Sequence, residues 1–277
     1  MLAGYHAVRE WPVTVRQVLI SGAGSGFGRA LAQHFAAAGC RVGCADINAD
    51  SARETAAMLP GDGHRVYQVD VGDDASVARW QSEVAATGEP VDILINNAGI
   101  ASGGTLLEAD MAEWDRVLNI NLLGIVRACR AFLPAMQKTG RGHIVNVASF
   151  AALAGGPGIM SYGVAKAGAY TLSDQLRAEL HSSGIKVSVV CPAFFQTNLL
   201  SNWEGSARMR GVAEKLMRDS PDTLDSVSKA TFEAIERGDF LILPTKREPM
   251  RWRIKRWFPN LYFRQLMKLV ASRSRGG

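Results

Sequence analysis

The chain has 277 residues, of which 47% are hydrophobic, so it can bury the core of one large α/β domain and is not a disordered protein. No uninterrupted apolar run reaches the roughly 18 residues that a membrane-spanning helix needs. The net charge of +5 is uneven, because residues 246–277 hold ten of the 31 Lys and Arg residues and one of the 26 acidic residues.

Short apolar strands alternate with helices along most of the chain. The predicted strands are Val15–Ile20, Arg41–Ala45, His64–Val69, Val91–Ile95, Gly142–Val147, Lys186–Val190 and Phe240–Leu243. The predicted helices are Arg29–Ala38, Ala49–Leu59, Asp73–Ala86, Asp110–Lys138, Ser161–Ser182 and Thr223–Arg237. Strands that are apolar throughout indicate a parallel sheet covered on both faces. We therefore predict an α/β fold of the Rossmann type, a doubly wound parallel sheet flanked by helices.

Two segments depart from this alternation. Phe195–Asp222 shows no regular pattern, and a long excursion of this kind often forms a lid over a substrate. Residues 246–277 follow the last strand, and their apolar residues share one helical face: Phe258, Tyr262, Leu266, Leu269 and Val270. We therefore divide the chain into a catalytic α/β domain, residues 13–245, and a basic, amphipathic C-terminal extension, residues 246–277.

A glycine-rich turn lies between the first predicted strand and the first predicted helix. Its residues are Ser21, Gly22, Ala23, Gly24, Ser25, Gly26, Phe27 and Gly28. Glycines at such a turn let the backbone bend sharply and approach a pyrophosphate, which then lies against the N-terminus of the helix. The turn therefore predicts a dinucleotide site.

Asp46 ends the second predicted strand, 18 residues after Gly28. A carboxylate at this place accepts hydrogen bonds from the adenosine ribose hydroxyls and repels a 2′-phosphate. No Lys or Arg precedes Gly26 within the turn, and Arg41 lies at the far end of its strand. The sequence therefore favours NAD over NADP.

The spacing Gly22-x-x-x-Gly26-x-Gly28 resembles that of the short-chain dehydrogenase/reductase family. Further matches to the family follow in the family's order: Asp70-Val71, Asn96-Asn97-Ala98-Gly99, Asn121, Ser149, Tyr162-x-x-x-Lys166 and Pro192 to Thr197. One position departs from the pattern, since Ala193 stands where the family usually has glycine. The resemblance covers roughly residues 15–243.

The resemblance implies that four residues are catalytic: Asn121, Ser149, Tyr162 and Lys166. Together with the turn and Asp46, it predicts cofactor contacts at Gly22, Gly24, Ser25, Gly26, Phe27, Gly28, Asp46, Asp70, Val71, Asn97, Ala98, Gly99, Tyr162, Lys166, Pro192 and Thr197. By the same resemblance, Asp70 lies on the adenine side and Thr197 binds the nicotinamide carboxamide. Asn121 is expected to hold a water that links Lys166 to solvent.

Tyr162 and Lys166 carry the predicted proton transfer. A tyrosine has a pKa near 10 and is a poor base at neutral pH. Lys166 follows four residues later on the same helix face, so its ammonium can lower the pKa of the tyrosine. Tyr162 can then remove an alcohol proton in oxidation and return it in reduction. Ser149, at the end of its strand, can hydrogen-bond the substrate oxygen.

The expected activity is NAD(P)-dependent interconversion of a hydrophobic secondary alcohol and its ketone, with lipid- and sterol-like alcohols among the candidates. The apolar residues expected near the substrate are Phe150, Ala151, Leu153, Gly156, Phe194, Phe195 and Trp203. The alternative is a non-catalytic protein of the same fold that senses the cofactor and acts through a partner or a membrane surface. The resemblance also implies a homodimer or homotetramer built on the two longest helices.

The four cysteines form no Cys-x-x-Cys pair and no cluster with metal-ligand spacing, so we expect reduced thiols and no metal site. Residues 1–12 contain no apolar stretch of the kind found in a secretory signal. We therefore expect a cytoplasmic location, either free or at a membrane surface.

The C-terminal extension leaves two alternatives open. Basic residues mixed with Trp and Phe, as in Arg251-Trp252-Arg253-Ile254-Lys255-Arg256-Trp257, suit the surface of an anionic membrane. The same pattern would serve a helix that packs on its own subunit or on a neighbouring one. We expect no nucleic-acid binding, since the chain carries no motif for it.

Overall fold

The computed structural model describes residues 15–197, 200 and 203–274. Seven parallel strands form the central sheet in the order β3-β2-β1-β4-β6-β7-β9. Their bounds are β1 Gln17–Ser21, β2 Arg41–Asp46, β3 Arg65–Gln68, β4 Ile93–Asn96, β6 Gly142–Val147, β7 Ile185–Val190 and β9 Leu241–Ile242. The predicted doubly wound sheet is confirmed. The strand order reverses between β1 and β4, where the carboxyl ends of the strands diverge and ligands of such folds bind.

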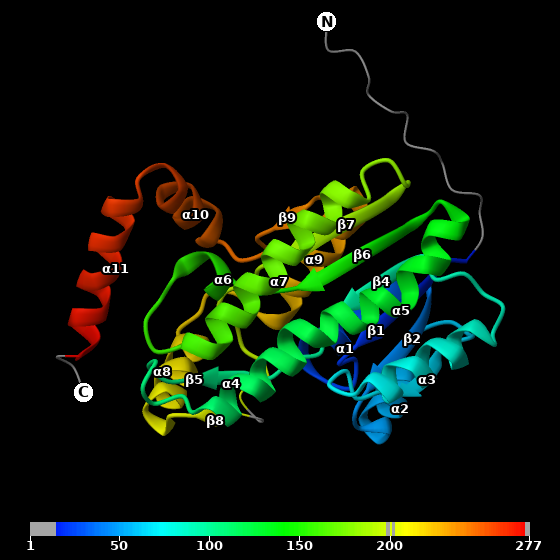
Figure 1. Cartoon of the computed structure of the whole chain (residues 1–277), viewed down its shortest axis with the longest axis horizontal. Coiled ribbons are helices and arrows are strands. Elements are labelled where there is room, and N and C mark those ends of the chain that lie inside the picture. The colour runs from blue at the N-terminus through cyan, green and yellow to red at the C-terminus, as the bar shows by residue number, and fades with distance from the viewer. Residues whose placement is uncertain (1–14, 198–199, 201–202, 275–277) are drawn as a thin grey trace, which may run out of the picture.

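Helices cover both faces of the sheet (Figure 1). On one face lie α1 Gly26–Ala37, α2 Ala49–Met58 and α9 Leu224–Arg237, and on the other lie α3 Asp74–Ala85, α5 Gly124–Thr139 and α7 Met160–Glu179. Each face has its own apolar core, one containing Leu31, Phe35 and Ile235, the other Trp80 and Phe132. The rings of Trp80 and Phe132 meet edge to face, with their centroids 4.7 Å apart.

Two predicted helices differ from the structure. The first begins at Gly26 rather than Arg29. Glycine is a poor helix former, so the pattern assigns Gly26 and Gly28 to the turn although they lie in the first turn of the helix. The helix predicted at Asp110–Lys138 is three segments, α4 Met111–Leu118, the π-helix η1 Asn119–Leu123 and α5. A single π-turn inside a long helix does not alter the apolar pattern enough to be foreseen from it.

The continuous helix Met111–Thr139 is long enough to cross a membrane, and its most apolar 18 residues have a mean hydropathy of 1.3. In this structure its α5 part lies on the sheet, and Ile125, Phe132 and Met136 are buried in the core. The helix is therefore a core helix of the α/β fold.

The expectation of irregular structure over Phe195–Asp222 is wrong for most of that segment. It contains β8 Trp203–Gly205, which pairs with β5 Ala101–Gly103, and α8 Ala207–Arg218. The sequence hides both elements, because β8 has three residues and α8 buries only Ala213 and Met217. A lid role for this segment stays a prediction.

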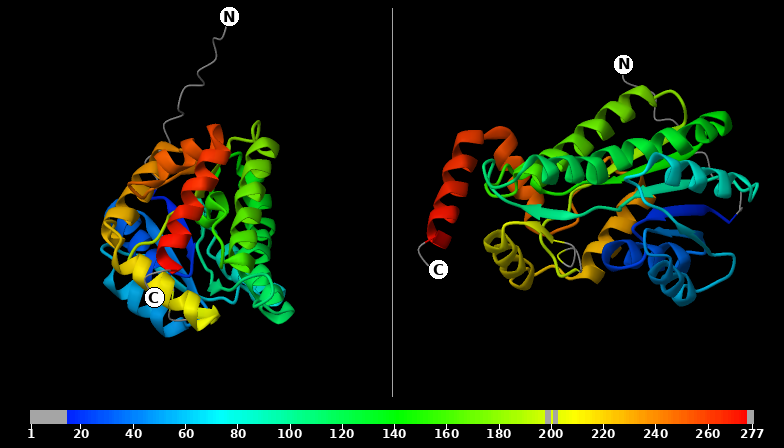
Figure 2. Two further views of the ribbon diagram at one scale, coloured as in Figure 1. Left: turned by 90° about the vertical axis from the view of Figure 1, so that its left-hand side faces the viewer. Right: turned by 60° about the horizontal axis from the view of Figure 1, so that its bottom comes forward.

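The C-terminal extension contains α10 Glu248–Trp257 and α11 Pro259–Ser274. Both helices lie at one end of the molecule, near the short helix α6 Ala151–Ala154 (Figures 1 and 2). The arrowhead of β6 points toward this end, so the extension lies on the side of the molecule where the parallel strands finish (Figure 1).

Candidate active site

The glycine turn is shaped by contacts that exclude larger side chains. Gly22 and Gly26 have φ angles of +66° and +49°, in the region that favours glycine. A Cβ on Gly28 would lie 2.1 Å from the carbonyl oxygen of Gly22, and one on Gly24 would lie 2.3 Å from Ser51 Oγ. The turn therefore brings bare backbone to the N-terminus of α1, as binding of a pyrophosphate requires.

Side chains from two directions hold this turn in place. Asn97, just after β4, donates from Nδ2 to the carbonyl oxygens of Ser21 and Gly22 at 3.0 Å each. Arg29 donates to the carbonyl oxygen of Gly24 from within α1. The sequence analysis gave Arg29 no role, because its position in the first turns of a helix does not distinguish it from a solvent-exposed charge.

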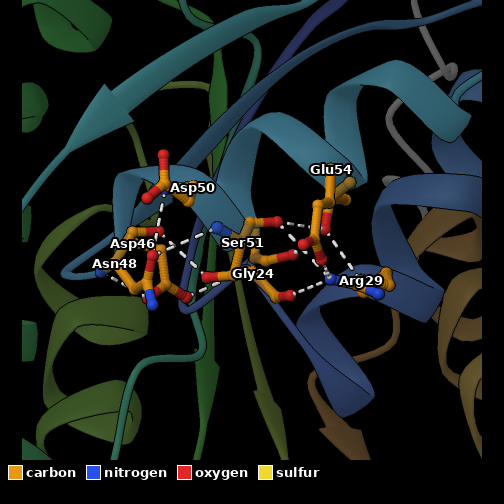
Figure 3. A network of polar contacts seen from close by, with 9 residues as sticks. Gly24, Arg29, Asp46, Asn48, Asp50, Ser51 and Glu54 are labelled. Atoms are coloured by element: carbon orange, nitrogen blue, oxygen red, sulfur yellow. Dashed lines mark hydrogen bonds and ion pairs between the residues drawn. The ribbon is translucent and has the colours of Figure 1, made fainter.

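Asp46 lies beside the turn, at the end of β2 (Figure 3). Its carboxylate accepts from the backbone N–H of Gly24 at 2.8 Å and from that of Asn48 at 3.0 Å. Arg29, the nearby cation, is directed to the Gly24 carbonyl, to Thr55 Oγ1 at 2.8 Å and to Glu54. The ribose end of the site thus presents the carboxylate of Asp46 to a ligand. The guanidinium of Arg29 is already bound to groups of the protein.

A cavity of about 340 Å³ adjoins Asp46 and is lined by Ile47, Gln68, Asp70, Asp73, Ser76, Arg79 and Glu83. Asp70 accepts from the backbone N–H of Gly72 at 2.7 Å and so shapes the loop after β3. Ile47 follows directly after β2, and its side chain is 63% exposed. An exposed aliphatic side chain beside this cavity suits the face of an adenine ring. This role of Ile47 could not be predicted from the sequence, because a single Ile after a strand has no distinguishing pattern.

These residues fit a dinucleotide, and not all of them can use their side chains to bind it. Ser25 is exposed at the N-cap of α1, and its hydroxyl makes no capping hydrogen bond. Phe27 instead buries its ring against Phe195, with centroids 5.5 Å apart, and Val71 is buried in the core. Phe27 and Val71 can therefore contact a cofactor only through their backbones.

The four predicted catalytic residues come from β6, η1 and α7. Lys166 donates from Nζ to the carbonyl oxygen of Val147 at 2.9 Å and lies 5.8 Å from the centroid of the Tyr162 ring. Ser149, two residues beyond Val147, lies close enough to Tyr162 for its hydroxyl to lower the pKa of the tyrosine. The structure therefore brings the serine, the tyrosine and the lysine together at the carboxyl end of β6.

Burial dominates the proton affinities of this cluster. It lowers the pKa of Lys166 to about 8 and raises the pKa of Tyr162 above its usual value, because the effect of burial exceeds the opposing effect of the nearby Ser149 hydroxyl. The lowering of the Tyr162 pKa expected from Lys166 and the bound nicotinamide stays a prediction.

Asn121 lies in the π-helix and is fully buried. Its Oδ1 accepts from the N–H of Ile100 at 2.8 Å, and its Nδ2 donates to the carbonyl of Ile100 at 2.9 Å. A Cβ on Gly99 would lie 2.8 Å from Asn121 Oδ1 and 3.4 Å from Lys166 Nζ. Asn121 thus fixes the backbone beside Lys166. Its water-holding role stays a prediction.

Two polar residues near the catalytic cluster, Asn119 and Ser161, form hydrogen bonds that join elements of the fold. Asn119 donates to the carbonyl of Gly72 and accepts from Arg127, facing away from Lys166. Ser161 lies in the first turn of α7, whose N-cap is Ile159. It is buried inside α7 and bonds to Ser102 Oγ at 2.7 Å and Glu113 Oε1 at 2.6 Å. Glu113 lies among the charged residues of α4 near Asp115 and Arg116, so its burial could not be predicted from the sequence.

The remaining predicted residues are placed as follows. Ala98 donates its N–H to Ser21 Oγ at 3.1 Å, and the carbonyl of Pro192 accepts from the N–H of Phe150 at 2.8 Å. Thr197 is half-buried after β7. Of the residues expected near the substrate, Phe150, Leu153 and Phe195 are core side chains, because they pack beneath the strand ends.

A family model described as short chain dehydrogenase matches residues 16–207. The probable oxidoreductase EphD of Mycobacterium tuberculosis is 39% identical over 187 residues, which are 66% of this chain and 32% of that protein. The chain thus spans about a third of that relative. The meso-2,3-butanediol dehydrogenase of Serratia marcescens is 34% identical over 191 residues, 69% of this chain and 76% of that protein.

Solved structures with the same architecture hold either nicotinamide cofactor. A short-chain dehydrogenase/reductase from Burkholderia phymatum in complex with NAD superposes with a TM-score of 0.83 at 27% identity, covering 91% of this chain and 96% of that one. A short-chain dehydrogenase from Sphingobium yanoikuyae in complex with NADPH gives 0.75 at 27% identity, covering 92% and 95%.

Proposed function

The chain belongs to the short-chain dehydrogenase/reductase family of NAD(P)-dependent oxidoreductases, and we propose that it interconverts an apolar secondary alcohol and its ketone with NAD as the preferred cofactor. The observation that carries this proposal is the arrangement of Ser149, Tyr162 and Lys166 at the carboxyl end of β6. The glycine turn and Asp46 lie at the ends of the adjacent strands, where a dinucleotide would be held.

The proton chemistry follows from this cluster. When bound, the nicotinamide cofactor accepts or supplies the hydride. Tyr162 removes the hydroxyl proton of the alcohol in oxidation and returns it to the carbonyl oxygen in reduction. Ser149 donates a hydrogen bond to the same substrate oxygen, where charge develops. The ammonium of Lys166 supports the tyrosinate, and two of its three N–H groups remain for ribose hydroxyls beside the one bound to Val147.

Two features support the preference for NAD. Asp46 offers carboxylate oxygens to a ribose diol and would repel a 2′-phosphate. Arg29 is turned away into the Gly24 carbonyl and Thr55. A site adapted to NADP would instead need a cation directed toward the ribose.

The apolar substrate class is supported by the elements next to Tyr162. Trp203 in β8 lies over Gly103 of β5, and Met209 in α8 lies against Gly158, in the loop that leads into α7. Phe194, 38% exposed, follows the end of β7. The family model matches residues 16–207, so most of α8 lies beyond the matched part of the chain.

The test is NADH formation at 340 nm with a panel of secondary alcohols. It runs from 2,3-butanediol, the substrate in the name of the Serratia relative, to long-chain and cyclic alcohols. We expect kcat/KM to rise with apolar surface, and to be higher with NAD than with NADP. Asp46→Ser should narrow the cofactor preference by about tenfold, since a charged hydrogen-bonding partner of the ribose is lost. A preference for diols would contradict the apolar substrate class. A preference for NADP would contradict the proposed cofactor.

We also propose that the protein assembles through α4–α5 and α7 and acts on the cytoplasmic side. Leu123 and Val164 are exposed by 45% and 46% on these helices, which supports a partner on this face. Light scattering should give a dimer or tetramer that Val164→Glu dissociates. A monomeric wild-type protein would contradict the proposed assembly.

A further inference from the structure

The outer surface of the C-terminal extension carries large apolar side chains that this chain leaves in solvent. Trp257 is 73% exposed, Phe258 62%, Met250 60% and Phe263 59%. Trp257 and Met250 share the outer face of α10, and Phe258 and Phe263 continue this surface across the turn into α11. Four large exposed side chains within 14 residues form a patch of the kind that marks an interaction surface.

The helix α11 is packed less closely against the rest of the chain than the other helices are. Among its side chains that the structure describes, those of residues 259–271, none is buried. Its apolar residues Tyr262, Leu266 and Met267 are half-buried, while Phe263 and Leu261 remain exposed. A helix of this composition usually buries its apolar face against something, and this chain alone covers only part of it.

Positive charge surrounds the apolar patch. The exposed cations are Lys246, Arg247, Arg251, Arg253, Arg256, Arg264 and Lys268. The one acidic residue of the extension, Glu248, is buried and paired with Arg251. Within the described part of the chain, no carboxylate forms an ion pair with Arg253, Arg256 or Arg264. The surface therefore presents unneutralised cations beside exposed aromatic rings.

The inner side of the extension is fixed to the catalytic domain. Trp252 packs against the core that includes Leu153, and Lys255 donates from Nζ to the carbonyl oxygen of Leu153. Lys255 also lies 5.7 Å from the centroid of the Tyr262 ring, which joins α11 to α10. Because α6 begins two residues after Ser149, the extension is held beside the catalytic end of the sheet.

We propose that this face of the extension, centred on Trp257, Phe258 and Phe263, binds the surface of an anionic phospholipid bilayer. Aromatic rings insert at the level of the headgroups, and Lys and Arg side chains meet lipid phosphates. A second copy of the chain is a poorer occupant, since two such faces, each with seven exposed Lys and Arg side chains and no exposed carboxylate among its described residues, would repel one another. If the proposed function holds, an apolar substrate dissolved in the bilayer would reach the catalytic end of the enzyme directly.

The test is flotation of the full-length protein with vesicles of phosphatidylcholine alone or mixed with phosphatidylglycerol. We expect binding to the mixed vesicles only, weakened by high salt. Trp257→Ala combined with Phe258→Ala and Phe263→Ala should reduce it about tenfold or more, as should Arg253→Glu with Arg256→Glu. The matched control, Lys138→Glu with Lys229→Glu, makes the same charge change on exposed residues of the catalytic domain and should leave binding unchanged.

Thermal unfolding and NADH binding show whether each variant is folded, and neither readout requires the proposed substrate. The proposal is overturned if wild-type protein stays unbound with both vesicle types. It is also overturned if the control pair weakens binding as much as the arginine pair, which would indicate attraction by net charge alone. Loss of oligomerisation in the aromatic variant, without vesicle binding by the wild type, would assign the face to a second copy.

Discussion

The catalytic end of the sheet and the C-terminal extension differ in how their polar and apolar groups are satisfied. Around Lys166, polar groups are buried and satisfied: Asn121 engages both polar groups of Ile100, and Lys166 bonds to Val147. In the extension, Trp257 and Phe258 are exposed, and the neighbouring arginines have few carboxylates to pair with.

The difference teaches what each region can do by itself. A buried, hydrogen-bonded cluster holds its geometry before any ligand arrives, which suits chemistry at one defined atom. On an exposed aromatic and basic surface, the side chains become ordered only when a partner binds. Such a surface can therefore bind a partner that is itself fluid, such as a bilayer. If this contrast is right, changes at the catalytic end should alter rates, whereas changes in the extension should alter where the protein is found.

The largest effect is expected from Lys166→Met. Methionine suits the buried site but supplies neither the charge that supports the tyrosinate nor a donor for ribose. We expect kcat/KM for alcohol oxidation to fall about 10²–10⁴-fold, the usual range for loss of acid–base assistance. Lys138→Met, on the exposed end of α5, is the matched control and should retain wild-type rates. Similar activity in both variants would remove Lys166 from the mechanism.

The second effect concerns the glycine turn. Gly28→Ala places a Cβ 2.1 Å from the backbone oxygen of Gly22, which cannot move aside as a flexible side chain could. We expect a loss of about 1–3 kcal/mol of unfolding free energy together with weaker cofactor binding. Denaturant unfolding and NADH titration measure the two losses. Gly211→Ala, at an open position within α8, should be neutral or stabilising. Wild-type NADH affinity in Gly28→Ala would contradict the close packing described.

The third effect is on the pH dependence. Tyr162 must be deprotonated to accept the alcohol proton, and its pKa is raised in the free protein, so oxidation should accelerate as pH increases from neutral. The slope should approach tenfold per pH unit until Tyr162 titrates in the complex. Reduction needs the protonated tyrosine and should slow over the same interval. Lys166, with a pKa of about 8, loses its charge in this range and should limit the gain. A flat oxidation profile from pH 6 to 9 would contradict this assignment, provided that the chemical step limits the rate.

The smallest effect is expected from the extension. Trp257→Ala with Phe258→Ala should change kcat/KM for a water-soluble alcohol by less than about twofold, because exposed side chains remote from reacting groups contribute little to the barrier. The initial rate at 340 nm measures it. A tenfold loss with a soluble substrate would show that the extension shapes the active site itself, and the contrast between the regions would fail.

The elements around Tyr162 were predictable from the sequence because their local patterns are strong. Seven strands and the turn from Gly22 to Gly28 each have a signature within a few residues. Features that depend on distant partners were not predictable. Glu113 is buried only because Ser161 and Ser102 arrive from other elements, and β8 exists only because β5 pairs with it. The π-turn around Asn121 likewise depends on packing rather than on composition.

The cofactor side shows the same limit. Asp46 was identified by its place at a strand end, but the engagement of Arg29 with Gly24 becomes visible only when α1, α2 and the turn are assembled (Figure 3). The raised pKa of Tyr162 also required the fold, since a four-residue spacing gives the direction of the lysine's influence but not the depth of burial.

The central claim is that Tyr162 moves the proton in a reaction between an alcohol and a nicotinamide cofactor. Its most direct test compares wild type with Tyr162→Phe, which removes one hydroxyl and keeps the ring. The two readouts are NADH formation at 340 nm with the best alcohol of the panel and NADH affinity from quenching of tryptophan fluorescence. We predict a fall in kcat of about 10²–10⁴-fold with NADH affinity nearly unchanged. Equal rates in the two proteins would contradict the account.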